Sequence, residues 1–178
     1  MNQIKYLLTL GLILSNLGLA AQDTLNMNDV YMDNLLVFKI SDGERFTGIA
    51  QKKRKNGQLV NEDKFEDGVV RWTKLYFNTK KKLLSDKIVY HKYILWEDKE
   101  RIRFRLSQDT LHIKTYDEKG KKLLIREYEN NKVVYSCEYN GRKKHGKEFC
   151  YDEDGNELIF HYVNGKKQKV RNVRLYKE

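Results

Sequence analysis

Histidine is the residue type best suited to hold a metal or move a proton near neutral pH, and this chain has four. None of them has a histidine or cysteine neighbour at the spacing of a metal-ligand motif. The sequence therefore predicts no metal site and no bound cofactor. The four histidines are His91, His112, His145 and His161.

The acidic run that begins at Asp152 is the nearest approach to a calcium loop. If Asp152 is the first position of such a twelve-residue loop, Glu157 stands where glycine is required and Val163 where a bidentate glutamate is required. The sequence also has no Gly-x-Ser-x-Gly elbow, no phosphate-binding glycine loop and no local cysteine-nucleophile signature. We therefore expect a hairpin turn at these residues and a protein that is not an enzyme.

Two cysteines, Cys137 and Cys150, flank a hairpin expected around residues 140–146. If Tyr139 lies opposite Glu148, the two cysteines face each other across the strands, where a disulfide can form. In a different register they lie on opposite faces, because side chains alternate along a strand. The sequence leaves both registers open.

Basic residues cluster near the expected turns. Stacked hairpins could align these clusters along one edge of a sheet as a linear positive stripe that contacts an anionic surface. The simpler interpretation, which we favour, is that lysines at turns and edges keep a sheet soluble and discourage edge-to-edge pairing. The candidate contacts are Lys52, Lys53, Arg54, Lys80, Lys81, Arg142, Lys143, Lys144, Lys166 and Lys167.

The first twenty residues have the order of a secretory signal peptide: Lys5, an apolar run, then small residues up to Ala20. Polar residues interrupt the apolar run, which is shorter than the roughly 20 residues of a spanning helix. No cysteine lies near the cleavage site to accept a lipid. We expect cleavage near Ala20 and a periplasmic or secreted protein with no transmembrane segment in the mature chain.

Loss of Lys5 lowers the formal net charge from +10 to +9. A basic balance of this kind attracts anionic partners over a long range. Export removes nucleic acid as the natural partner. An acidic protein, an anionic lipid or a cell-wall polymer remains.

Short apolar runs separated by Asn-Gly and Asp-Gly pairs fill the remaining chain, and proline is absent. Such pairs suit the positive φ angles of tight hairpin turns. The connections are two to six residues long, so consecutive strands should pair antiparallel, and there is no room for parallel crossovers. The predicted fold is all-β, an antiparallel meander of hairpins in one elongated sheet, preceded by the helix of the signal peptide. Strands are expected at 35–40, 46–53, 58–65, 69–77, 81–90, 93–97, 101–106, 109–116, 121–128, 132–139, 146–152, 156–163 and 170–176.

The chain also repeats itself. Gly48 and Gly57 are nine residues apart, as are Gly146 and Gly155, and each pair is followed by an aromatic-x-x-Gly element. One hairpin unit is therefore predicted to recur, and stacking its copies would make the recurring tyrosines mostly core. The glycines expected at repeat turns are Gly48, Gly57, Gly68, Gly120, Gly141, Gly146, Gly155 and Gly165.

This pattern resembles the MORN repeat in its bacterial variant form, the YwqK-type antitoxin module. The closest stretch runs from Tyr139 to Leu158, with the order aromatic-x-Asn-Gly, x-Gly, aromatic and Asp-x-x-Gly, and Phe46-Thr47-Gly48 is similar to the usual opening of such a module. The likeness covers roughly residues 46–168 and lacks glycines from 83 to 106. The resemblance implies an elongated hairpin sheet and an antitoxin or immunity role, although a protein that leaves the cytoplasm cannot be a standard intracellular antitoxin.

The chain is therefore expected to divide into four segments. Residues 1–20 are the signal peptide, 21–45 a lead-in with the first strand, 46–168 the repeat region with a degenerate stretch at 83–106, and 169–178 a C-terminal strand and tail. About 158 residues remain after cleavage, which is one domain by the usual size. We expect an exported, non-enzymatic protein-interaction module of the cell envelope, with binding of anionic lipid or cell-wall polymer through a lysine-rich edge as the alternative.

Overall fold

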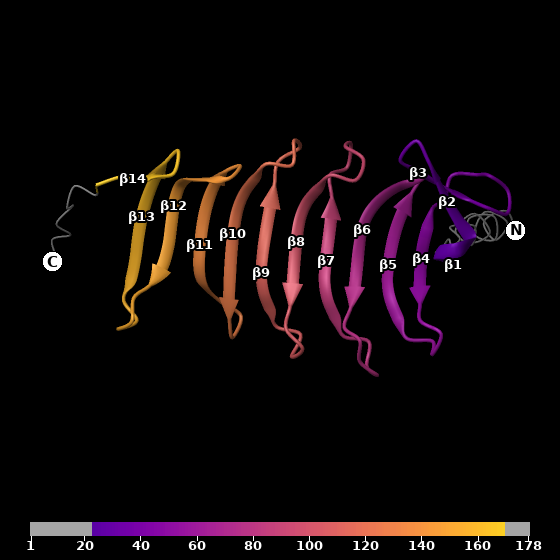
Figure 1. Cartoon of the computed structure of the whole chain (residues 1–178), viewed down its shortest axis with the longest axis horizontal. Helices are drawn as coiled ribbons and strands as arrows, with labels where there is room; N and C mark the ends of the chain where they lie inside the picture. The colour runs from indigo at the N-terminus through magenta and orange to yellow at the C-terminus, as the bar shows by residue number, and fades with distance from the viewer. Residues whose placement is uncertain (1–22, 170–178) are drawn as a thin grey trace, which may run out of the picture.

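A computed structural model describes residues 23–169 and confirms the predicted fold class: the chain is a long meander of antiparallel hairpins in one open sheet (Figure 1). The sheet has 12 strands in the order β1-β4-β5-β6-β7-β8-β9-β10-β11-β12-β13-β14, and β2 and β3 form a separate two-stranded sheet. Apart from β1, each strand pairs with its neighbour in sequence because the connections are too short for anything else. The strands of the large sheet are β1 Thr24–Asn26, β4 Gly48–Lys53, β5 Leu59–Glu66, β6 Val69–Tyr76, β7 Leu84–Tyr90, β8 Asp98–Phe104, β9 Thr110–Tyr116, β10 Lys122–Glu129, β11 Lys132–Asn140, β12 Lys143–Tyr151, β13 Glu157–Val163 and β14 Lys166–Lys167.

The lead-in folds back over the first strands of the sheet. After β1 comes a single 3-10 turn, Met27–Asp29, whose start is capped by the Asn26 side chain, and then β2 Val30–Asp33 and β3 Leu36–Lys39. Val37 of this segment and Phe46, which directly follows it, pack on side chains of β4 to β6. The buried hydrophobic cluster consists of Val37, Phe46, Ala50, Phe65 and Val70.

The rest of the sheet is a single layer. Apart from Cys137, every fully buried hydrophobic residue of the described chain belongs to the N-terminal cluster. The tyrosines of the C-terminal strands are half-buried or exposed, so the prediction that the recurring tyrosines are mostly core was wrong. The reason is that one sheet has two faces, and in the described part of the chain only the lead-in packs on either of them.

Three further expectations differ from the structure. β1 pairs parallel with β4, because the β2–β3 hairpin supplies the crossover that we thought had no room. Residues 93–97 form no strand; they belong to the connection 91–97, which places Trp96 against Phe65 and Tyr90. That connection and residues 77–83 are both longer than six residues.

The glycine-poor stretch 83–106 nevertheless holds two ordinary strands, β7 and β8. The signal-peptide helix and the strand expected at 170–176 lie outside the described residues. Within residues 23–169, no helix has the length and apolar character needed to cross a membrane.

Candidate functional site

One face of the large sheet can be followed across ten strands by the register of its pairs, because directly opposite residues project to the same side. The row begins under the lead-in and ends on open surface. It consists of Ala50, Asp63, Thr73, Ile88, Arg101, Lys114, Ile125, Cys137, Glu148 and Phe160. Within residues 23–169, the chain therefore covers the N-terminal part of this face itself and places nothing over the part formed by β8 to β14.

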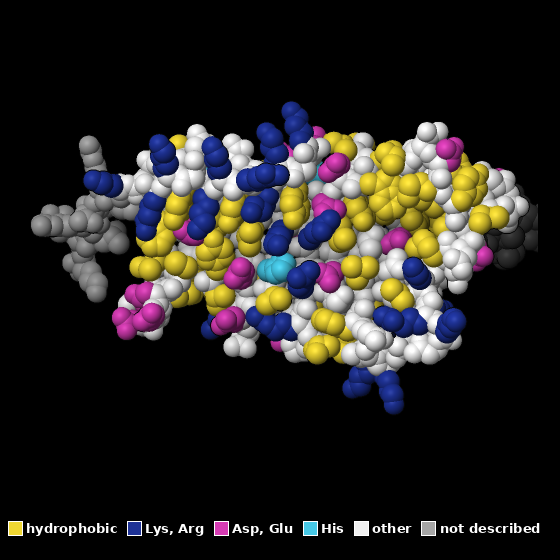
Figure 2. Space-filling model, in the orientation of Figure 1, with side chains coloured by type: hydrophobic (Ala, Val, Ile, Leu, Met, Phe, Trp, Pro, Cys, Tyr) yellow, Lys and Arg dark blue, Asp and Glu magenta, His cyan; other side chains and the backbone are white. Residues whose placement is uncertain are grey.

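Lysine side chains lie over aromatic rings on this uncovered part. Lys122 Nζ is 3.6 Å from the centre of the Tyr139 ring, and Lys167 Nζ is 3.3 Å from that of Phe160. Lys144 Nζ lies 5.1 Å from the Tyr162 ring. A cation over a ring face is attracted to it, and the apolar stem of the lysine shields the ring from water. Figure 2 shows hydrophobic side chains in bands over the C-terminal strands, with Lys and Arg side chains among them and along the upper edge.

The buried carboxylate of Glu148 holds the Tyr135 ring and the Lys144 ammonium group in place on this face. Glu148 is only 5% exposed, accepts a hydrogen bond of 2.9 Å from the Tyr135 hydroxyl and is ion-paired with Lys144. Burial alone would raise the pKa of Glu148, but hydrogen bonds from Lys144, Tyr162 and Tyr135 outweigh it and lower that pKa. Burial, together with the contacts to Cys137 and Glu148, raises the pKa of Tyr135. Glu148 therefore stays charged and fixes the ring and the cation next to it.

A cavity of about 210 Å³ lies on the same face over β7 to β9. Arg101 and Arg103 of β8 and Lys114 of β9 contribute its positive charge. Arg103 is ion-paired with Asp86 at 3.0 Å, and Arg101 is paired with Asp98. The remaining lining is Leu75, Asp86, Ile88, Ile102, His112 and Tyr116. We call the open surface of β8 to β14 the basic-aromatic face; its members are Arg101, Arg103, Lys114, Lys122, Tyr135, Tyr139, Lys144, Phe160, Tyr162 and Lys167.

The pKa of His112 depends on its burial and on the charges around this cavity. Burial, Lys114 and Arg103 lower its pKa, and Glu127 and Asp86 oppose them only in part. Lys122 responds in the same way, because burial and the nearby Lys114 lower its pKa. Burial is the first cause of both shifts, and the neighbouring cations add to it.

The predicted lysine stripe is split between two opposite edges of the sheet (Figure 1). Loops alternate between the edges in a meander, so the five N-terminal members lie at one edge and the five C-terminal members at the other. The single aligned stripe that the sequence offered as the less favoured alternative is therefore not formed. Lys52, Lys53, Arg54, Lys80 and Lys81 flank the β4–β5 and β6–β7 connections, whereas Arg142, Lys143, Lys144, Lys166 and Lys167 flank the β11–β12 and β13–β14 turns.

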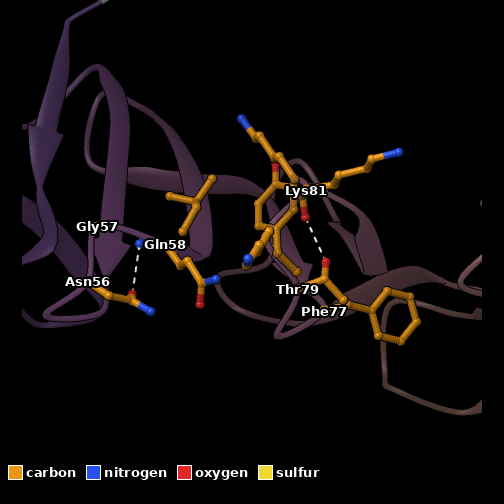
Figure 3. Close-up of a pocket in the computed structure, with 10 residues that line it drawn as sticks. Asn56, Gly57, Gln58, Phe77, Thr79 and Lys81 are labelled. Atoms are coloured by element: carbon orange, nitrogen blue, oxygen red, sulfur yellow. Dashed lines mark hydrogen bonds between the residues drawn. The ribbon is translucent and has the colours of Figure 1, made fainter.

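The N-terminal edge has an open cavity of its own, of about 380 Å³ (Figure 3). Two loops form it. In one, the Asn56 side chain accepts a hydrogen bond of 3.1 Å from the backbone amide of Gln58; in the other, the Thr79 hydroxyl donates to the carbonyl of Lys81 over 2.7 Å. Lys80, Lys81 and Lys82 all line this cavity.

The two cysteines are free thiols. Cys137 lies opposite Glu148, and Ser136 lies opposite Phe149, so neither of the registers considered from the sequence is formed. Cys150 shares the face of Glu148 but lies two residues along the strand, which places the thiols diagonally rather than across from each other. The bulge between Cys137 and Tyr139 sets this offset.

Two of the glycines expected at turns lie in strands instead. Gly48 begins β4 under the lead-in, where a Cβ would meet the Phe46 ring and the carbonyl of Asp23. Gly146 lies inside β12 at φ +96°, against the Glu138 side chain. Their repetition reflects close packing, not turn formation. The other six have positive φ angles at the connections: Gly57, Gly68, Gly120, Gly141, Gly155 and Gly165.

Sequence reasoning missed the cavity residues altogether. The signal was present, because Arg101 and Arg103 alternate along one strand and His112 and Lys114 along the next, which places each pair on one face. We overlooked it because this stretch lacks the glycines by which the repeat was recognised. Among residues 23–169, no group of three or more histidine, cysteine or acidic side chains is arranged to hold a metal ion.

Comparisons with known proteins give no family. No family model and no curated protein matches the chain. Among solved structures, a crystal structure of the GtfA/B complex bound to UDP and GlcNAc is similar over 75% of this chain, with 11% identity and a TM-score of 0.34. The chain spans 23% of the length of that protein.

Proposed function

We propose that this chain is an exported, non-enzymatic repeat protein that binds another protein across its basic-aromatic face. One observation carries the proposal: the lead-in covers the N-terminal part of this face, and no other segment of residues 23–169 covers the rings and cations over β8 to β14. Aromatic side chains and arginine are the residues most enriched at protein interfaces. A rigid sheet presents them without a large ordering cost.

The charge of the face points to an acidic partner. Lys122, Lys144 and Lys167 hold positive charge beside rings along its C-terminal half. Complementary charge on a partner accelerates association and selects against basic surfaces. The signal-peptide pattern favours a partner in the cell envelope, and the likeness to MORN-variant modules favours an immunity-like role, in which binding neutralises a harmful protein.

Capture of envelope proteins on immobilised residues 21–178, followed by affinity measurement with the captured protein, tests the proposal. The variant Lys122→Gln with Lys167→Gln removes two cations of the face and should weaken binding by roughly tenfold. The matched control, Lys52→Gln with Lys53→Gln, removes the same charge from the N-terminal edge and should leave the affinity unchanged. A partner whose affinity falls only with the control pair would contradict the proposal.

The second candidate function is binding of anionic lipid or cell-wall polymer at the N-terminal edge. The observation in its favour is that Lys80, Lys81 and Lys82 line one open cavity beside the loop that follows Lys52 and Lys53. Sedimentation with anionic vesicles or cell-wall material over a salt series tests it. Binding should fall as salt rises and should be lost in Lys52→Glu with Lys53→Glu, while binding that ignores both changes would refute it.

A further inference from the structure

We propose that the cavity over β7 to β9 is a carboxylate-binding site, formed by Arg101, Arg103 and Lys114, that receives one acidic side chain of the partner protein. This inference rests on the proposed function and names the chemistry of its contact. The site lies where the covered and uncovered parts of the sheet face meet, between the connection 91–97 and the open strands.

The register brings the three cations together. Arg101 lies directly opposite Lys114, and Arg103 lies directly opposite His112 on the same face. Each arginine uses its Nε atom for an acidic neighbour on its own or the adjacent strand, which orients the guanidinium group and leaves its terminal nitrogens as donors. Within residues 23–169, the Lys114 side chain has neither an ion pair nor a hydrogen bond, although it is only half-exposed.

The cavity floor strengthens such a contact. Leu75 and Ile88 are the apolar side chains of the lining that share the face of the cations, because Ile88 lies opposite Arg101 and Leu75 lies opposite Asp86, the partner of Arg103. Electrostatic attraction is stronger beside a surface that excludes water than in open solvent. His112 and Tyr116 add two polar side chains that make no hydrogen bond of their own with any described residue.

The charge balance selects a carboxylate over a doubly charged group. Arg101, Arg103 and Lys114 provide three positive charges, and Asp86 and Asp98 remove two, so that one remains. The next groups outward on this face, Lys122 and Glu127, cancel each other. The lowered pKa of His112 keeps its ring neutral near pH 7. One uncompensated positive charge matches the single charge of a carboxylate.

The test follows the His112 ring by NMR while hexaglutamate is added to the mature protein, with the signal assigned by His112→Gln. A bound carboxylate should raise the pKa of His112, because it offsets Lys114 and Arg103. Lys114→Gln should weaken hexaglutamate binding roughly fivefold. Lys87→Gln is the matched control: it removes one charge from the opposite face of β7, where Lys87 lies opposite Ile102, and should change nothing.

Equal weakening by Lys114→Gln and Lys87→Gln would overturn the site, because only total charge would matter. So would a His112 signal that responds to inorganic phosphate but not to hexaglutamate at the same ionic strength. A captured partner that binds Lys114→Gln as tightly as the unchanged protein refutes this site and leaves the proposed function standing. A response of His112 to hexaglutamate without any captured partner refutes the proposed function and leaves the site standing.

Discussion

The carboxyl group of Asp63 lies in the covered part of the sheet face, and its replacement by asparagine is predicted to stabilise the fold near neutral pH. Asp63 is 9% exposed, and within residues 23–169 its Oδ1 atom has no hydrogen-bond partner. Its other oxygen accepts a bond of 3.2 Å from the Asn61 amide. Burial raises the pKa of Asp63, and the nearby Thr73 hydroxyl and Asn61 amide oppose the rise only in part. The charged form is therefore a cost to the folded state.

The size of the effect follows from the unpartnered atom, since a buried polar atom without a partner costs about 1–3 kcal/mol. An amide at this position keeps the bond from Asn61 and can donate to the Thr73 hydroxyl. We expect Asp63→Asn to raise the free energy of unfolding by about 1 kcal/mol near pH 7, or roughly 2–4 °C in Tm. The pKa of Asp63 is higher in the folded than in the unfolded chain, so its neutral form contributes stability below the unfolded value of 3.8 that is lost as pH rises through the folded value. The advantage of the variant should disappear at low pH.

Urea unfolding followed by tryptophan fluorescence, near pH 3.5 and near pH 7, measures both quantities. Asp33→Asn is the control, because Asp33 is exposed on β2 and should give no gain at either pH. A loss of stability in Asp63→Asn near pH 7, or an equal gain at both pH values, would refute the reasoning.

Three further predictions concern the open face and its strands. Lys144→Met should lower the free energy of unfolding by about 1–2 kcal/mol near pH 7, because Glu148 stays charged but loses its cation. Because the pKa of Glu148 is lowered in the folded chain, this loss should become smaller as pH falls through that pKa. An equal cost for the exposed Lys143→Met would contradict this. In urea unfolding, Gly146→Ala should lower the free energy of unfolding by roughly 2 kcal/mol and Gly57→Ala by roughly 1 kcal/mol. Both positions have positive φ, but only Gly146 is crowded by Glu138. Equal losses would show that the crowding is unimportant. Cys150 should react with a thiol reagent faster than the buried Cys137, and intact-mass measurement without reductant should find both thiols; a mass lower by two hydrogens would contradict the observed register.

The meander could be predicted because its signals are local. Asn-Gly and Asp-Gly pairs determine where the chain turns, and alternation shows which runs are strands. The β1–β4 pair could not be predicted in this way, because parallel pairing of Thr24–Asn26 depends on a contact across the whole β2–β3 hairpin. The cysteine register failed for a similar reason: the two steps from Cys137 to Tyr139 face four steps from Lys144 to Glu148, and the extra residues of β12 shift every later pair.

The candidate site was predicted only in part. Lysine clusters at turns were visible, but their separation onto two edges follows from counting strands, and that count was wrong where residues 93–97 were taken as a strand. Tyrosine recurrence was also visible, yet burial depends on a second layer that the sequence does not specify. The cavity cations were hidden because Arg101, Arg103 and Lys114 come from neighbouring strands and meet only through register.

Oxidative footprinting of the complex with the captured partner tests the central claim most directly, because the neighbouring strands β11 and β12 carry tyrosines on opposite faces. Tyr135 and Tyr139 belong to the basic-aromatic face, whereas Tyr151 lies on the opposite face of β12. We predict that the partner protects Tyr135 and Tyr139 from oxidation and leaves Tyr151 as reactive as in the free protein. Protection of Tyr151 with unchanged Tyr135 and Tyr139 would place the partner on the other face and contradict the proposal.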